Sequence, residues 1–255
     1  MKKMILSVLL AAGLAAPASA QSPVTLRVIS PGFTYNAGLV AFAAGFEREA
    51  GIKVQVAPFG MTRMVPELQT GNPAADIVFL PINLMDDMEK AKAIQPGSRI
   101  AIGRVNIGLA VHKGDPVPDI STVDKLAAVL KAADPVMYSN PKSGSMEANI
   151  IDAMLKSHPE FAGVKTRIST NGEGGEAVSR GEGQMALQLI CEIVNHPDAL
   201  ANAGPLPPEL HAWIDGVAAI SARAPHPKEA AQFLKYITQP GTYSLWLSRG
   251  LERVK

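Results

Sequence analysis

The chain has 255 residues, a formal net charge of +1 and 47% hydrophobic residues. The near-neutral charge excludes the bulk attraction that drives binding to nucleic acids or anionic membranes. Its single cysteine, Cys191, excludes an intramolecular disulfide and a multi-cysteine metal site, and its five histidines are scattered without metal-ligand spacing. We therefore expect no metal, no cofactor and no nucleic-acid partner.

The first twenty residues have the pattern of a secretory signal peptide. Two lysines, Lys2 and Lys3, precede an apolar stretch at 4–15, and a small-x-small cleavage pattern ends at Ala20. The apolar stretch is too short to span a bilayer stably, and no other run approaches the ~20 residues of a transmembrane helix. We expect cleavage after Ala20 and a monomeric periplasmic protein that begins near Gln21. A buried N-terminal helix is the alternative interpretation.

The pattern from residue 24 to residue 80 predicts the start of an α/β domain. We expect strands at 24–29, 52–57 and 75–80, and helices at 37–50 and 64–70. Gly51 and Gly71 follow the two predicted helices, as glycines at helix ends commonly do. The third strand is almost wholly apolar, which is typical of a parallel strand buried on both faces. The βαβαβ order indicates an α/β fold.

A second α/β unit is predicted at roughly residues 105–195. We expect strands at 104–112, 135–139, 164–169 and 185–190, and helices at 123–132, 145–157 and 175–180. Ser121 or Thr122 is expected to cap the first of these helices. The segment 196–210 is rich in proline and lacks periodicity, so we expect an irregular surface crossing. A strand at 211–222 and helices at 227–237 and 242–250 complete the chain.

Several stretches resemble the periplasmic molybdate-binding proteins of ABC transporters. They are T-L-R-V-I-S at 25–30, F-E-R-E-A-G-I-K-V at 46–54, L-Q-T-G-N-P-A-A-D-I-V-F-L at 68–80 and A-A-Q-F-L-K-Y-I-T-Q-P-G-T-Y-S-L-W-L-S-R-G-L at 230–251. The resemblance implies a type II periplasmic binding fold, in which two α/β lobes are joined by a two-stranded hinge around an interlobe cleft. It implies lobe one at 24–104 plus 212–255, lobe two at 105–211, and an ABC transporter permease as a partner.

The resemblance places two ligand-binding loops in the first lobe. The matching positions hold Ser30, Thr34 and Tyr35 after the first strand, and Thr62 and Arg63 after the second. Helix starts favour anions because their backbone N–H groups are free. Arg63 departs from the family's neutral donors, and its planar guanidinium suits bidentate binding of a carboxylate. Ordinary helix capping by the threonines and an exposed arginine are the alternatives.

Two further loops belong to the second lobe. Lys142, Ser143, Gly144 and Ser145 match the family's third loop, and Asn171 and Gly172 match its fourth, which gives a backbone amide to the ligand. A well-capped helix and a flexible connector are the alternatives. The family's tyrosine near residues 185–190 is absent, and Lys142 is not part of the molybdate pattern. These departures predict a small organic di- or tricarboxylate as the ligand.

Two classes of function share this fold. The first is a binding protein that delivers its anion to a transporter by closing the two lobes. The second is an enzyme, because aconitate isomerases are similar to the same family and act on a tricarboxylate. An isomerase needs a base near the reacting carbon, and Tyr138, Glu173, Glu176 and Glu192 are the candidates. The sequence does not choose among them, and each is equally consistent with an ordinary surface or core position.

Overall fold

The computed structural model describes residues 24–71 and 74–253. The expected signal peptide and its cleavage site lie outside the described residues and stay a prediction. No helix within the described part is long and apolar enough to cross a membrane.

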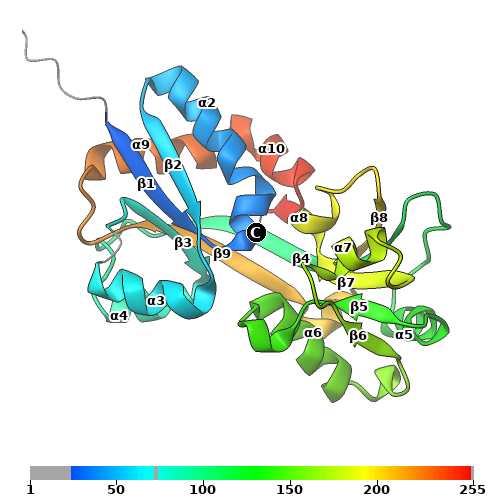
Figure 1. The fold of residues 1–255 in the computed structure, drawn as a ribbon. Helices are drawn as coiled ribbons and strands as arrows, with labels where there is room; N and C mark the ends of the chain where they lie inside the picture. The colour runs from blue at the N-terminus through cyan, green and yellow to red at the C-terminus, as the bar shows by residue number, and fades with distance from the viewer. Residues whose placement is uncertain (1–23, 72–73, 254–255) are drawn as a thin grey trace, which may run out of the picture.

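The fold is α/β with two lobes, built on one sheet of ten strands in the described residues (Figure 1). The strands are β1 (Thr25–Ser30), β2 (Lys53–Pro58), β3 (Ile77–Pro81), β4 (Ile100–His112), β5 (Val136–Tyr138), β6 (Thr166–Ile168), β7 (Met185–Leu189), β8 (Leu200–Pro205), β9 (Trp213–Ile220) and β10 (Leu251–Glu252). The main order is β2-β1-β3-β9-β4-β7-β5-β6, with β8 and β10 paired to β4.

Helices flank the sheet in both lobes. They are α1 (Gly32–Thr34), α2 (Val40–Ala50), α3 (Met61–Thr70), α4 (Ile82–Lys90), α5 (Val123–Ala132), α6 (Met146–Ser157), α7 (Gly174–Ser179), α8 (Ile190–Ile193), α9 (Pro227–Thr238) and α10 (Tyr243–Ser248). Thr122 caps α5 by accepting a hydrogen bond from the Lys125 N–H at 3.3 Å. Gly51 and Gly71 end α2 and α3 in the left-handed conformation that glycine adopts without strain.

Two long antiparallel strands, β4 and β9, connect the lobes (Figure 1). Residues 100–106 of β4 pair with β9, whereas residues 107–111 pair with β7 of the second lobe. In the first lobe β1, β2 and β3 are parallel, and in the second β5, β6 and β7 are parallel. The parallel strands of each lobe therefore point their carboxyl ends toward the junction, where α/β sheets place ligands.

Aromatic side chains close the core of the first lobe between helices from opposite ends of the chain. Phe42 on α2 lies 4.3 Å from Trp246 on α10, measured between ring centroids. Phe46 lies 5.2 Å from Phe233 on α9, edge to face. Edge-to-face and offset aromatic pairs contribute about 0.5–1.5 kcal/mol beyond their buried area. The C-terminal helices are thus part of the N-terminal core.

Asp76, in the G-N-P-A-A-D-I stretch, joins three segments of the first lobe. Its buried carboxylate accepts hydrogen bonds from the Arg27 N–H at 2.8 Å and the His226 N–H at 2.7 Å. One bond reaches β1 and the other reaches the start of α9. This position requires a buried carboxylate, because its two oxygens accept the hydrogen bonds of two backbone N–H groups.

The structure differs from the sequence expectation in five segments. Residues 200–205, expected to be irregular, form β8, which pairs with the end of β4 through backbone hydrogen bonds that need no side-chain periodicity. The helices α4 and α8 and the strand β10 were not expected. The expected helix at 37–50 is regular only from Val40, because a π-helical turn at Tyr35–Leu39 precedes it and Gly38 there has a φ of 105°.

Candidate ligand cleft

A cleft of about 240 Å³ lies at the junction of the two lobes. Its lining residues are Pro31, Gly32, Phe33, Phe59, Gly60, Ser143, Gly144, Ser145, Glu147, Glu173, Leu189, Glu192 and Ile214. Most of them follow the carboxyl ends of β1, β2, β5, β6 and β7. The volume is just below the range of drug-sized pockets, so the cleft suits a small solute.

A larger hollow of about 750 Å³ lies at the other end of the second lobe. His112, Pro135 and Met185 line it, and they stand at the end of β4 and at the amino ends of β5 and β7. Ligand sites of parallel sheets form at the carboxyl ends of the strands. The smaller cleft is therefore the better candidate site.

Helix starts from both lobes surround the cleft. Gly60 is the N-cap of α3, and Ser145 is the N-cap of α6, with its hydroxyl accepting a hydrogen bond from the Ala148 N–H at 3.3 Å. Gly144, with a φ of 82°, makes the tight turn that brings this loop to the cleft wall. Free N–H groups and the positive end of the helix dipole favour negative charge at these positions.

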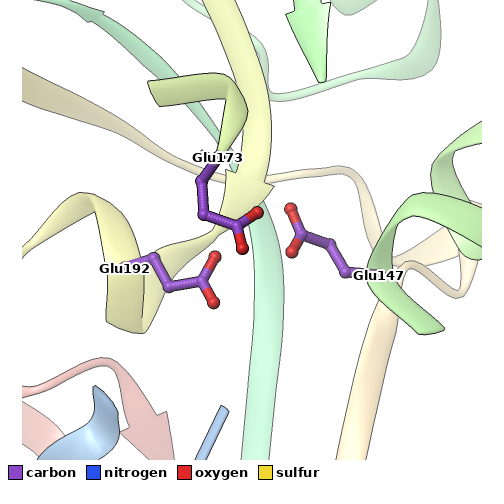
Figure 2. A group of neighbouring side chains, drawn as sticks. All are labelled: Glu147, Glu173 and Glu192. Atoms are coloured by element: carbon purple, nitrogen blue, oxygen red, sulfur yellow. The ribbon is translucent and has the colours of Figure 1, made fainter. Parts of the chain in front are cut away.

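Three glutamates converge at the wall of the cleft that belongs to the second lobe (Figure 2). Glu147 lies in the first turn of α6, Glu173 caps α7, and Glu192 lies in α8. One carboxylate oxygen from each lies within 4.8 Å of the others. Glu147 and Glu192 are buried, with exposed fractions of 3% and 8%.

Amide and hydroxyl donors hold two of these carboxylates. Glu192 accepts hydrogen bonds from the Asn36 side chain at 3.3 Å and the Gln188 side chain at 3.0 Å, one on each oxygen. Because Asn36 belongs to the first lobe, this bond links the two lobes. Glu173 accepts a hydrogen bond from the Ser139 hydroxyl and forms a capping box with Glu176 at the start of α7.

The charges of the three glutamates oppose one another. Burial, and then the charge of Glu173, raise the pKa of Glu192 to about 7, although the Gln188 and Asn36 donors lower it. Burial, followed by the charges of Glu192 and Glu173, raises the pKa of Glu147 well above its ordinary value. At an effective dielectric constant of 20, two unit charges about 5 Å apart repel by roughly 3 kcal/mol. The cluster is therefore costly unless a proton or a cation reduces its charge.

Several residues expected from the sequence to act in the site line this cleft. They are Ser143, Gly144 and Ser145 among the binding residues, and Glu173 and Glu192 among the candidate bases. The structure thus brings both loops of the second lobe to one place. Their contact with a ligand stays a prediction.

The predicted residues of the first lobe lie behind or beside the cleft. Ser30 and Thr34 are buried, and their hydroxyls are 2.7 Å apart in a hydrogen bond with each other, while the cleft is lined by the residues between them. Tyr35 is half-buried in the π-helical turn. The side chains of Thr62 and Arg63 lie outside the described residues, but their backbone forms the first turn of α3 beside Gly60.

The remaining predicted binding residues are exposed and do not line the cleft. Lys142 precedes the lining residues of its loop and donates its N–H to the Asn140 side chain at 2.9 Å. Asn171 and Gly172 lie in the loop before α7, where the Asn171 carbonyl accepts a hydrogen bond from Arg180 at 2.7 Å. The capping of α7 thus orders this loop without a ligand.

The other two candidate bases, Tyr138 and Glu176, are not among the residues that line the cleft. The Tyr138 hydroxyl lies 3.5 Å from an Asp152 carboxylate oxygen, and burial is the main cause that raises its pKa. Glu176 accepts the backbone N–H of Glu173 at 3.3 Å and so stabilises the start of α7. Both side chains have a structural contact that accounts for their position.

Among the residues that sequence reasoning did not assign to the site are three polar ones at the glutamate cluster. Glu147 lies two residues after the helix cap Ser145, in the first turn of a helix that follows a predicted binding loop. This position in the sequence could have identified it as a candidate site residue. Asn36 carried no such signal, because its contact with Glu192 joins residues far apart in the sequence. Gln188 is only four residues before Glu192, but its role depends on the turn from β7 into α8 that brings the two side chains together.

The comparisons with known proteins agree with this architecture. The model of the family described as bacterial extracellular solute-binding protein matches residues 26–252. An aconitate isomerase from Pseudomonas sp. is 27% identical over 240 residues, which cover 92% of this chain and 90% of that protein.

Two solved structures share the fold at low sequence identity. The substrate-binding domain assigned to a molybdenum ABC transporter from Clostridium difficile has a TM-score of 0.74 at 11% identity, over 91% of this chain and 100% of the other. The periplasmic molybdate-binding protein from Azotobacter vinelandii has a TM-score of 0.68 at 14% identity, over 90% and 100%.

Proposed function

Since the chain belongs to the bacterial extracellular solute-binding protein family, we propose that its cleft binds a small organic di- or tricarboxylate. The observation that carries the proposal is the interlobe cleft of about 240 Å³, which is formed by loops and helix starts of both lobes. Ser143 and Ser145 supply hydroxyls there, and the helix starts supply N–H groups. In this proposal the lobes close around the solute, and an ABC transporter permease receives it from a monomeric periplasmic protein.

The choice of a carboxylate rests on sequence features and on one relative. The relative from Pseudomonas sp. is named for aconitate, a tricarboxylate. Arg63 stands in the first turn of α3, three residues after the cleft residue Gly60, and Lys142 directly precedes the cleft residue Ser143 in the second lobe. A ligand with two or more carboxylates would use cations from both lobes.

Calorimetric titration of the purified chain tests the proposal. Citrate, cis-aconitate and trans-aconitate should bind more tightly than molybdate or sulfate, because only the acids present several separated carboxylates. Sub-micromolar binding of molybdate without any response to the acids would end the proposal.

Aconitate isomerisation is the second candidate function, and the carboxyl groups of the cleft favour it. The reaction removes a proton from a carbon next to a carboxylate, shifts the double bond and returns a proton to another carbon of the same molecule. Glu173 and Glu192 line the cleft and offer the oxygen that takes and returns this proton. The reaction consumes no co-reactant, so it needs one such carboxylate as the base and a cation that stabilises the charge developing on the substrate.

Incubation with trans-aconitate, followed by nuclear magnetic resonance, separates the two functions. An isomerase converts the trans isomer to the cis isomer until equilibrium, whereas a binding protein broadens or shifts the signals of one isomer only. Glu173→Gln should abolish conversion if Glu173 is the base, and Glu176→Gln, which alters only the capping box, is the matched control. Conversion at the rate of buffer alone would exclude the isomerase.

A further inference from the structure

The glutamate cluster presents a charge problem for any anionic solute. Glu147, Glu173 and Glu192 all line the cleft, and no lysine or arginine is among its described lining residues. A solute with two or three carboxylates would therefore enter beside as many as three further carboxylates. Like charges in a poorly hydrated site repel strongly, so the site needs a positive partner.

The hydrogen bonds around the cluster are those of carboxylates. Both oxygens of Glu192 accept side-chain amide hydrogen bonds, at 3.3 Å from Asn36 and 3.0 Å from Gln188. Glu173 accepts from the Ser139 hydroxyl and from the backbone at the start of α7. An ionised carboxylate is an acceptor at both oxygens, so these donors suit negative charge on both groups.

The third glutamate has an oxygen without a partner. Oε1 of Glu147 is fully buried and has no hydrogen-bond partner, and the side chain points toward the other two carboxyl groups (Figure 2). Buried polar atoms of native proteins are nearly always paired, so an unpaired oxygen in a cleft indicates that a bound group completes it.

We propose that Glu147, Glu173 and Glu192 bind a hard divalent cation, with Ca²⁺ as the best fit. Calcium takes oxygen ligands at 2.3–2.6 Å, so two ligands of one ion lie at most about 5 Å apart. The three carboxylates meet this condition, because their nearest oxygens lie within 4.8 Å of one another. Magnesium demands a stricter octahedral geometry at about 2.0–2.1 Å and keeps several of its waters, so a site of three carboxylates suits it less.

The cation would also bind the solute. Calcium takes about six to eight oxygens, and three glutamates fill only part of this shell, so positions facing the cleft remain open to a carboxylate of the ligand. The cation thereby converts three repelling carboxylates into a positive contact for an anion. This bridging role rests on the proposed function, whereas the cation site itself does not. The expectation of no metal rested on the scattered histidines and the single cysteine, and it did not consider a site made of oxygen ligands alone.

Calorimetry on the EDTA-treated full chain tests the cation site with CaCl2 alone, and with MgCl2 and MnCl2 for comparison. We expect one Ca²⁺ per chain with a dissociation constant of about 1 mM or tighter, the range of extracellular calcium modules, and a rise in melting temperature with Ca²⁺. Glu147→Gln should weaken Ca²⁺ binding at least about tenfold, since even indirect support of a metal ligand is worth that much.

Glu209→Gln, at an exposed position outside the cleft lining, is the matched control and should leave Ca²⁺ binding unchanged. Circular dichroism verifies that Glu147→Gln is folded, and Glu173→Gln replaces it if it is not. Ca²⁺ binding that is absent, or that is equal in the wild type and the folded variant, overturns the cation site.

Titration of citrate and aconitate with and without Ca²⁺ separates this inference from the proposed function. Tight binding of the acids only in the presence of Ca²⁺ supports both. Ca²⁺ binding with no binding of any acid leaves the cation site standing and rejects the carboxylate function. Equal binding of the acids in EDTA, with no binding of Ca²⁺, Mg²⁺ or Mn²⁺, rejects the cation site and leaves the function.

Discussion

The buried position of Glu192 predicts a measurable pH dependence of folding in the metal-free protein. Its pKa of about 7, compared with the ordinary value of 4.5, means that the folded protein holds a proton that the unfolded chain releases. The stability that this proton contributes is complete below pH 4.5 and is lost as the pH rises through 7. Each pKa unit corresponds to about 1.4 kcal/mol, so the loss is about 3 kcal/mol.

Glu192→Gln isolates this contribution, because glutamine keeps the shape of the side chain and does not titrate. We expect the wild type to lose about 3 kcal/mol more than the variant between pH 4.5 and pH 8. Urea denaturation in EDTA at several pH values measures both curves, and the difference between them cancels the titrating groups that do not interact with Glu192. Solvent screening does not reduce this free energy appreciably, because only 8% of Glu192 is exposed. Parallel curves would refute the reasoning.

Three further predictions concern the support and the chemistry of the cleft. Asp76→Ala removes the acceptor of two backbone N–H groups and should lower the free energy of unfolding by about 2–5 kcal/mol, measured by urea denaturation. Gly174→Ala places a Cβ 2.9 Å from the Tyr138 Cα, so the start of α7 must shift. We expect the free energy of unfolding to fall by about 1–3 kcal/mol and solute binding to weaken. Gly241→Ala is the control, because the space around Gly241 is open and neither quantity should change. Arg63→Ala should weaken carboxylate binding about tenfold to a few hundredfold by calorimetry, and Arg63→Lys should restore part of it, because a point charge does not reproduce the planar fork. Full affinity in Arg63→Ala would remove a main argument for a carboxylate.

The fold was predictable from the sequence where local patterns specify it. Alternation and apolar runs located the ends of β1, β2 and β3 to within two residues. Thr122, one of two expected caps, is the N-cap of α5, and Ser145, expected as the first residue of a helix, is the N-cap of α6. The strand β8 was missed, because its small and polar residues carry no period and its partner β4 supplies the order through the backbone. The helix α4 was missed although Met85 and Met88 repeat at a helical spacing.

The site was predictable only in part. The loop at 143–145 lines the cleft, and it could be found because its serines and glycine are consecutive in the sequence. The convergence of Glu147, Glu173 and Glu192 could not, because the three residues follow different strands and only the sheet order brings them together. Their spacing in the sequence carries no information about their distance in space.

In the first lobe, the residues that are synthesised first are not the first to reach their folded positions. This lobe begins with β1 near the amino terminus, but β9 and the helices α9 and α10 that complete its sheet and core come from residues 213–248. Until those residues leave the ribosome, Phe42 and Phe46 lack the partners that they have in Trp246 and Phe233. The second lobe is one contiguous stretch from the later part of β4 to β8, and it can therefore be complete while the first lobe is still open. The N-terminal segment from β1 to β3 is the last to reach its native core.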